Sequence, residues 1–159
     1  MNDAGWIQML CAATLIGMTA GLRAFTAPCI VSWAAFLAYL DPPTGWIGFI
    51  ARPYVAWILT ALALGEFVTD QLPSTPSRKV PVQFGARILC GGLSGAAIGA
   101  ASLSLPAGLI AGIVGAVIGP FGGAAARAAL ARALGRDRPA AIIEDGAAIA
   151  LGILAVAVA

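Results

Sequence analysis

Long apolar runs, most of them close to the length that a bilayer requires, make up most of this 159-residue chain. A membrane-spanning helix needs about 20 mainly apolar residues. Candidate segments run over residues 6–22, 24–40, 54–72, 86–105, 106–134 and 139–158. Because lipid offers no partners for backbone polar groups, such segments are expected to be helices. The sequence therefore predicts an all-α fold, a polytopic transmembrane helix bundle of about six segments, as a single integral membrane domain over residues 1–159.

The composition argues against a water-soluble fold and against several kinds of site. The chain is 60% hydrophobic and 10% charged, with a mean hydropathy of +0.94, whereas a soluble domain carries about 25% charged residues. The net charge of +2 is too small to indicate nucleic-acid binding. Histidine is absent and the three cysteines are isolated, so the spacing of zinc and redox motifs is missing. We expect membrane lipids as partners, no nucleic acid and no cofactor.

Lysine and arginine are distributed unequally between the connections. With six crossings, the first, third and fifth connections share one side of the membrane. Eight of the nine basic residues lie in or beside them, and only Arg52 lies on the opposite side. Basic residues concentrate on the cytoplasmic side of a membrane. The prediction is a multi-pass protein of the cell inner (cytoplasmic) membrane with both termini outside.

Glycine recurs at every fourth position in several of the segments. The series are Gly17 and Gly21; Gly91, Gly95 and Gly99; Gly108 and Gly112; and Gly115, Gly119 and Gly123. Small residues at this spacing allow two helices to approach closely. We expect glycine-rich packing faces, used within the chain or in a homo-oligomer. An alternative is that these thin faces allow helices to slide or a substrate to contact backbone.

Six ionisable residues lie inside the apolar segments or at their edges. They are Arg23, Glu66, Asp70, Arg127, Glu144 and Asp145. A charge within the bilayer costs about 2.5 kcal/mol or more and by default indicates a functional site. With six crossings, all six fall in the cytoplasmic half of the membrane, where we predict a substrate- or ion-binding cluster. Because Glu144 and Asp145 are adjacent, they point about 100° apart on a helix, and only one can easily face the same partner.

The two acids of the third segment are four residues apart. Glu66 and Asp70 therefore share one face of a helix. Two neighbouring anions need a positive partner, for which Arg23, Arg127, a bound cation or a proton are candidates. The alternative is a structural ion-pair network that locks the segments together.

The connection after the third segment combines two prolines, three hydroxyl groups and two cations. It reads QLPSTPSRK over residues 71–79. Prolines disfavour a helix there, and the hydroxyl and cationic groups can bind phosphate or carboxylate or anionic lipid headgroups. A rigid structural turn is the alternative. The candidate residues of this anion- or lipid-headgroup-binding loop are Ser74, Thr75, Ser77, Arg78 and Lys79.

Several strings of this sequence resemble those of a known family. They are GLRAFTAP over residues 21–28, EFVTDQLPSTPSR over 66–78, ARIL over 86–89 and the late pair Glu144 and Asp145. The chain resembles domain-of-unknown-function family 4126, small prokaryotic polytopic membrane proteins. The resemblance covers most of the chain and implies a membrane fold but no activity. Where such sequences are expected to read Asp-Lys, this chain has Asp70 and Gln71.

The leading functional hypothesis is a small transporter or channel-like protein. Its intramembrane carboxylate/arginine cluster would open to the cytoplasm and carry a small ion or polar metabolite. One alternative is a membrane-embedded enzyme or binder that acts on a lipid phosphate or headgroup, in which the carboxylates hold Mg²⁺. The other alternative is a structural membrane assembly protein. No residue is predicted to be catalytic, and non-enzymatic roles are favoured.

Overall fold

Helices are the only regular elements in the part of the chain that the structure describes. The computed structural model describes residues 3–41, 43, 45–69, 81–102, 104–135 and 137–159. The elements are α1 (Asp3–Leu22), α2 (Thr26–Phe36), the 3-10 helix η1 (Gly45–Ala51), α3 (Pro53–Thr69), α4 (Pro81–Ala101), α5 (Leu105–Leu134) and α6 (Asp137–Val158). The predicted all-α fold is confirmed.

Four of these helices are long and apolar enough to cross a membrane. They are α1, α4, α5 and α6, and the bent pair formed by η1 and α3 adds a fifth if it is counted as one span. The axes of η1 and α3 differ by 65°. These helices are typical of a protein embedded in a membrane.

The helix found within the expected segment 24–40 is shorter than a full membrane span. Its helix, α2, contains 11 residues, which extend over about 16 Å, roughly half the hydrocarbon core. The helix ends because Ala38 has a φ of +59°. The N–H groups of Ala38 and Tyr39 then turn back to the carbonyl oxygens of Ala35 and Ala34, as in a Schellman cap.

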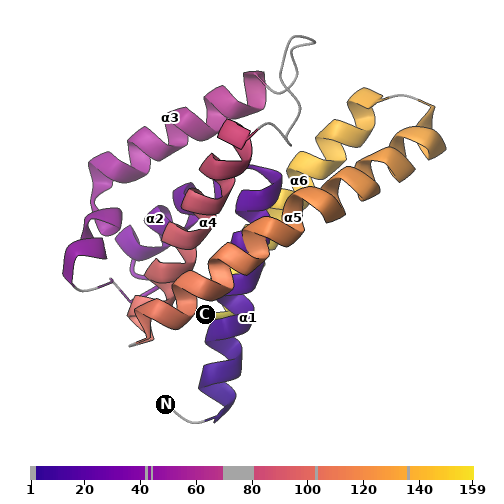
Figure 1. Cartoon of the computed structure of the whole chain (residues 1–159). Coiled ribbons are helices and arrows are strands. Elements are labelled where there is room, and N and C mark those ends of the chain that lie inside the picture. Colours follow the sequence, from indigo (N-terminus) through magenta and orange to yellow (C-terminus); the bar gives the residue numbers. More distant parts are fainter. Residues whose placement is uncertain (1–2, 42, 44, 70–80, 103, 136) are drawn as a thin grey trace.

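The helices run alternately up and down in the view of Figure 1. The α1–α2 break, the end of α3, the start of α4 and the α5–α6 turn all lie toward the upper end. The C-terminal half of α5 and the first turns of α6 extend to the right beyond the other helices (Figure 1). These helix ends therefore gather at one end of the bundle.

Helices α1, α4 and α5 contact one another at glycines. A Cβ atom added to Gly119 of α5 would lie 2.5 Å from the carbonyl oxygen of Met18 in α1. A Cβ added to Gly95 of α4 would lie 2.7 Å from the Cα of Gly112 in α5 and against the carbonyl oxygen of Gly108. Such close backbone contact is how small residues stabilise helix pairs in membranes, where apolar burial alone contributes little.

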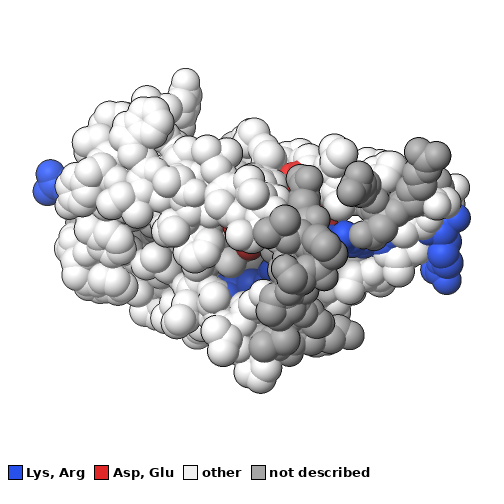
Figure 2. Space-filling view, turned by 90° about the horizontal axis from the view of Figure 1, so that it is seen from above, with Lys and Arg blue, Asp and Glu red and all other residues white. Residues whose placement is uncertain are grey.

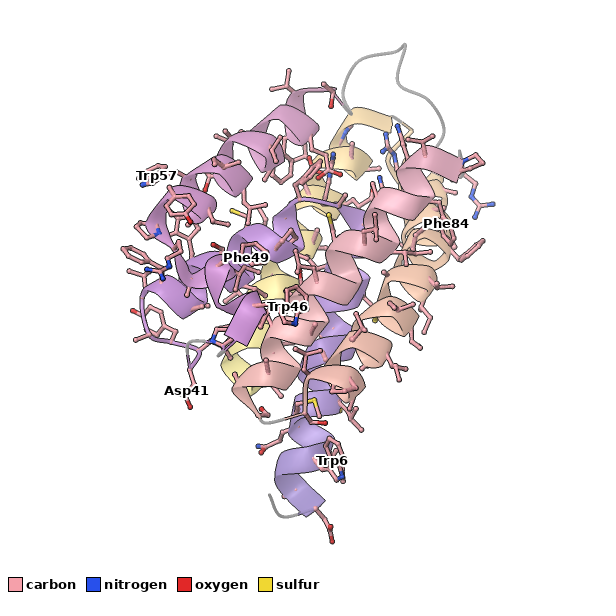
Figure 3. All side chains as sticks on the ribbon, turned by 60° about the vertical axis from the view of Figure 1, so that its left-hand side comes forward. Trp6, Asp41, Trp46, Phe49, Trp57 and Phe84 are labelled. Atoms are coloured by element: carbon pink, nitrogen blue, oxygen red, sulfur yellow. The ribbon has the colours of Figure 1, made fainter. Side chains whose placement is uncertain are left out.

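The short helix α2 is held to η1 and α3 by polar and aromatic contacts. The Ser32 hydroxyl donates to the carbonyl oxygen of Ile50 at 2.5 Å, and the indole N–H of Trp33 donates to the Thr60 hydroxyl at 2.9 Å. The rings of Trp33 and Trp57 meet edge to face, with their centroids 5.2 Å apart. Figure 3 shows Trp57 on the outer side of α3, across the molecule from Phe84.

We predict that Gly95→Ala destabilises the protein, whereas Gly85→Ala on the same helix does not. A methyl group at Gly95 meets backbone atoms of α5, while one at Gly85 meets nothing within 4 Å. Overpacking costs about 1–3 kcal/mol, and alanine otherwise favours a helix over glycine. The measurement is thermal unfolding of the detergent-solubilised variants. Equal melting temperatures would show that the close contact of α4 and α5 is not required.

Candidate functional site

The candidate site is built around an interruption in the helical path. Helix α1 ends at Leu22 and α2 begins at Thr26, so residues 23–25 leave backbone groups of two helix ends without helical partners. Unsatisfied backbone groups are costly in an apolar environment. In this protein, side chains from other helices bind both ends of the break.

The carbonyl end of α1 is bound by an arginine from α4. Arg87 is 2% exposed, and its Nη1 donates to the carbonyl oxygens of Gly21 at 2.5 Å and Leu22 at 2.7 Å. A cation at this position also interacts favourably with the negative end of the helix dipole. Arg87 therefore donates the hydrogen bonds that the next turn of α1 would otherwise supply.

The amino end of α2 is bound by a carboxylate from α3. Oε1 of Glu66 accepts a hydrogen bond from the backbone N–H of Ala24 at 2.7 Å, and Oε2 accepts one from Phe25 at 2.9 Å. Phe25, which precedes the helix, has no side-chain cap of its own. An anion at a helix N-terminus is stabilised by these donors and by the dipole. Glu66 thus caps a helix to which it does not belong.

Arg23 lies inside the break and joins three helices. It is 1% exposed, its Nε donates to Oδ1 of Asp145 in α6 at 2.9 Å, and its Nη2 donates to the same oxygen. Its Nη1 lies 3.5 Å from the carbonyl oxygen of Glu66. The guanidinium also stacks over the Phe67 ring, 4.9 Å from the centroid, where a cation–π attraction operates.

A second ion pair lies beside the first. Nη1 of Arg127 in α5 is 3.5 Å from Oε2 of Glu144, whose side chain is 6% exposed. A Cβ added to Gly123 would contact the Leu22 side chain and lie 3.0 Å from Oε1 of Glu144, so this pair sits next to the end of α1. Figure 2 shows acidic and basic atoms near the middle of the molecule when it is seen from above.

The groups that cap the break also line a cavity. Its volume is about 220 Å³. Its lining comes from the break, the last turns of α3 and the first turns of α4, and comprises Ala24, Phe25, Leu62, Glu66, Thr69, Gln83, Ala86 and Arg87. A cavity with a mainly apolar lining and two charged side chains therefore adjoins the backbone groups of two helix ends.

The structure brings five of the six residues of the predicted substrate- or ion-binding cluster into two neighbouring groups. Arg23, Glu66 and Asp145 meet at the break, and Arg127 pairs with Glu144. The adjacent acids Glu144 and Asp145 contact different helices, as their helical spacing predicts. In the described part of the chain, no group of three or more acidic, cysteine or histidine residues is arranged to hold a metal ion.

One expectation differs from the geometry. The Glu66 carboxylate is bound by two backbone N–H groups rather than by the side chain of Arg23 or Arg127. A backbone partner has no signature in residue identity, because every residue except proline supplies the same N–H group. Asp70 and the loop candidates lie outside the described residues; the loop candidates are Ser74, Thr75, Ser77, Arg78 and Lys79.

Arg87 is the residue that the sequence reasoning missed as a site candidate. In the sequence it belongs to the ARIL string of the family resemblance and to the basic residues that indicate the topology. Its position between Ala86 and Ile88, just inside an apolar segment, was the available signal, because a cation there must find partners within the protein.

We predict that Asp145→Asn destabilises the protein, because it removes the negative charge that accepts two hydrogen bonds from the buried Arg23 guanidinium. Breaking one side of a buried ion pair costs about 3–5 kcal/mol. The double variant Arg23→Met with Asp145→Leu should lose less, since the guanidinium and the carboxylate that faces it are removed together. Unfolding in mixed micelles, followed by circular dichroism, measures the free energies. The exposed Asp41 provides the control: a loss no larger than that of Asp41→Asn would exclude a buried ion pair.

Comparison with known proteins identifies the family. A family model described as Domain of unknown function (DUF4126) matches residues 10–159, and this confirms the resemblance found in the sequence. None of the curated proteins and none of the solved structures matches the chain. The site described above is therefore interpreted from its own geometry. The match covers nearly the whole chain, so the protein belongs to the DUF4126 family.

Proposed function

We propose that this protein is a small transporter or channel-like membrane protein whose polar centre is the α1–α2 break. The observation that carries the proposal is the cavity of about 220 Å³, which is lined by the same two charged residues, Glu66 and Arg87, that bind the two helix ends. Many secondary transporters build their substrate and ion sites from interrupted helices, whose ends point at the bound species.

The neighbouring ion pairs connect this polar centre to other helices. Arg23 links the break to α6 through Asp145, and Arg127 links α5 to α6 through Glu144. A change in the charge of the cavity would therefore alter the positions of helices that lie outside it. We propose that Asp70 acts as a substrate- or ion-binding residue and that the loop residues bind an anion or a lipid headgroup; these loop residues are Ser74, Thr75, Ser77, Arg78 and Lys79. The substrate is a small ion or polar metabolite.

We further propose six membrane segments that pack through glycine-rich faces in the cytoplasmic membrane, with both termini outside. The support is the alternation of helix directions: the break, the end of α3, the start of α4 and the ends of α5 and α6 that follow each other in the chain lie toward one end (Figure 1). Eight of the nine basic residues belong to these regions or to their flanks. The positive-inside rule then assigns this end to the cytoplasm.

Cysteine labelling tests this topology. In a background with Cys11, Cys29 and Cys90 replaced by alanine, single cysteines are placed by Arg52→Cys, Arg78→Cys and Arg136→Cys. A membrane-impermeant maleimide added to intact cells should modify only the first, and the other two should react only in inside-out vesicles. Modification of the Arg78 and Arg136 positions from opposite sides would refute the six-segment topology.

Flux measurements test the function. Purified protein is reconstituted in liposomes, and proton, sodium, potassium and chloride fluxes are followed with entrapped dyes. Glu66→Gln keeps the shape of the side chain but removes a charge that accepts two hydrogen bonds. Weakening these hydrogen bonds to a charged group costs about 1.5–3 kcal/mol, which predicts a flux reduced by roughly 10- to 100-fold. The control variant Asp41→Asn, at an exposed position, should match wild type. Flux in Glu66→Gln equal to wild type would remove the cavity from the pathway.

The same contacts favour one second function, a structural membrane assembly protein. Glu66, Arg23 and Asp145 all bind partners within the protein, which is what a purely structural network requires. The two functions differ in one measurable respect. A structural role predicts that Glu66→Gln lowers the melting temperature of a protein that shows no flux in its wild-type form.

A further inference from the structure

We infer that a second cavity, at the junction of α2, η1 and α3, binds the headgroup of an anionic phospholipid whose phosphate is held by Arg52. This junction cavity lies at the opposite end of α3 from the α1–α2 break. The inference goes beyond the proposed function, because lipid binding at the junction does not require transport.

The junction cavity is large enough for a headgroup. Its volume is about 640 Å³, and small-molecule sites commonly have volumes of about 300–1,000 Å³. Its walls come from the end of α2 at Ala35 and Phe36, from η1 and from Tyr54 at the start of α3. The early end of α2 and the 65° bend between η1 and α3 leave this space between the three elements.

The lining offers a cation without a protein partner. Within the part of the chain that the structure describes, the Arg52 side chain forms neither an ion pair nor a hydrogen bond, whereas Arg23 and Arg87 at the break are bound by protein oxygens. The hydroxyl of Tyr54, which lines the same cavity, is equally unpartnered in that part of the chain. A guanidinium and a hydroxyl are both donors that bind phosphate oxygens.

The depth of Arg52 explains why it needs such a partner. Arg52 and Glu66 are 14 residues apart, and α3 covers nearly all of that interval. The two charges are therefore about 20 Å apart along the helix, which is less than the hydrocarbon thickness of about 30 Å. They do not both reach opposite headgroup layers of an undisturbed bilayer. Glu66 is bound by the protein, and a bilayer drawn inward at the junction cavity brings a phosphate to Arg52.

Aromatic side chains place the junction cavity at a membrane interface. Phe36 and Phe49 belong to its lining. Tyr54 and Trp57, one helical turn apart on α3, are 61% and 64% exposed, and such residues concentrate at the level of the headgroups. Figure 3 shows Trp57 and Phe49 on the side of the molecule away from Phe84. The rings supply apolar surface for the first carbons of the acyl chains.

The charge of the lining selects among phospholipids. None of the described residues that line the junction cavity is acidic. The amine of a zwitterionic headgroup would therefore find no carboxylate there. A headgroup of the phosphatidylglycerol type has one negative charge, which Arg52 matches, and free hydroxyl groups, which can bond to Tyr54.

A lipid titration followed by native mass spectrometry tests the inference. Delipidated protein in detergent is titrated with phosphatidylglycerol and with phosphatidylcholine of the same acyl chains. Phosphatidylglycerol should bind saturably and about fivefold more tightly, as expected for one arginine near a membrane surface. Arg52→Gln should abolish this preference. The matched control is Arg132→Gln, an exposed arginine in the last turn of α5, which should retain it.

A second variant tests the junction cavity rather than the charge. Ala51→Phe adds a ring to the lining but leaves Arg52 in place, so phosphatidylglycerol binding should weaken by about fivefold or more. If Arg52→Gln does not fold, Ala51→Phe decides alone. Equal affinity for the two lipids, an equal loss in Arg132→Gln, or unchanged binding in Ala51→Phe would each overturn the inference.

A soluble competitor separates a lipid from a free phosphate compound. Glycerol phosphate carries the same phosphate but no acyl chains for the rings of Phe36 and Phe49. It should displace phosphatidylglycerol only at concentrations at least about tenfold higher than those of a short-chain phosphatidylglycerol. Displacement at equal concentrations would overturn the assignment to a lipid.

Discussion

The structure depends on the side chains that hydrogen-bond the two helix ends at the α1–α2 break in apolar surroundings. Between Leu22 and Thr26 the chain changes direction, and the freed carbonyl and N–H groups have no water to bind in a membrane. Arg87 binds the carbonyl end and Glu66 binds the N–H end, each with the charge that its helix end favours. Without these two side chains, the short helix α2 would have no stable start, and the cavity beside it would lose its two charged lining residues.

Glycine contacts make the rest of this arrangement possible. Helices α1, α4 and α5 approach until their backbones touch at Gly95, Gly112 and Gly119. This contact carries Arg87 on α4 close enough to reach the end of α1. The outer elements differ: α3 and η1 are joined to α2 by a few hydrogen bonds and by aromatic rings such as Trp33 and Trp57, and Figure 3 shows Trp46 and Phe49 on η1. A tightly packed centre thus lies beside a loosely held helix that contributes the cavity's acid.

Residue identity and spacing predicted much of the site but not its connections. The burial of Arg23 and the separate partners of Glu144 and Asp145 follow from charges in apolar helices and from the 100° step between adjacent residues. The partner of Glu66 could not be predicted, since backbone N–H groups are common to nearly all residues. The sequence does not single out Arg87 as a site residue, because it lies close to the start of its segment. A position outside the membrane accounts for a charge there equally well.

The sequence alone determined that the chain is helical, apolar and charged at only a few internal positions. These properties depend on composition and local periodicity, which act within one helix. Only the tertiary structure decided that α2 is half the length of a span, that η1 and α3 bend by 65°, and that Glu66 and Arg87 cap two ends of the same break. The capping contacts join residues more than 40 positions apart, and the end of α2 depends on the local turn at Ala38; hydrophobic patterns carry no information about either.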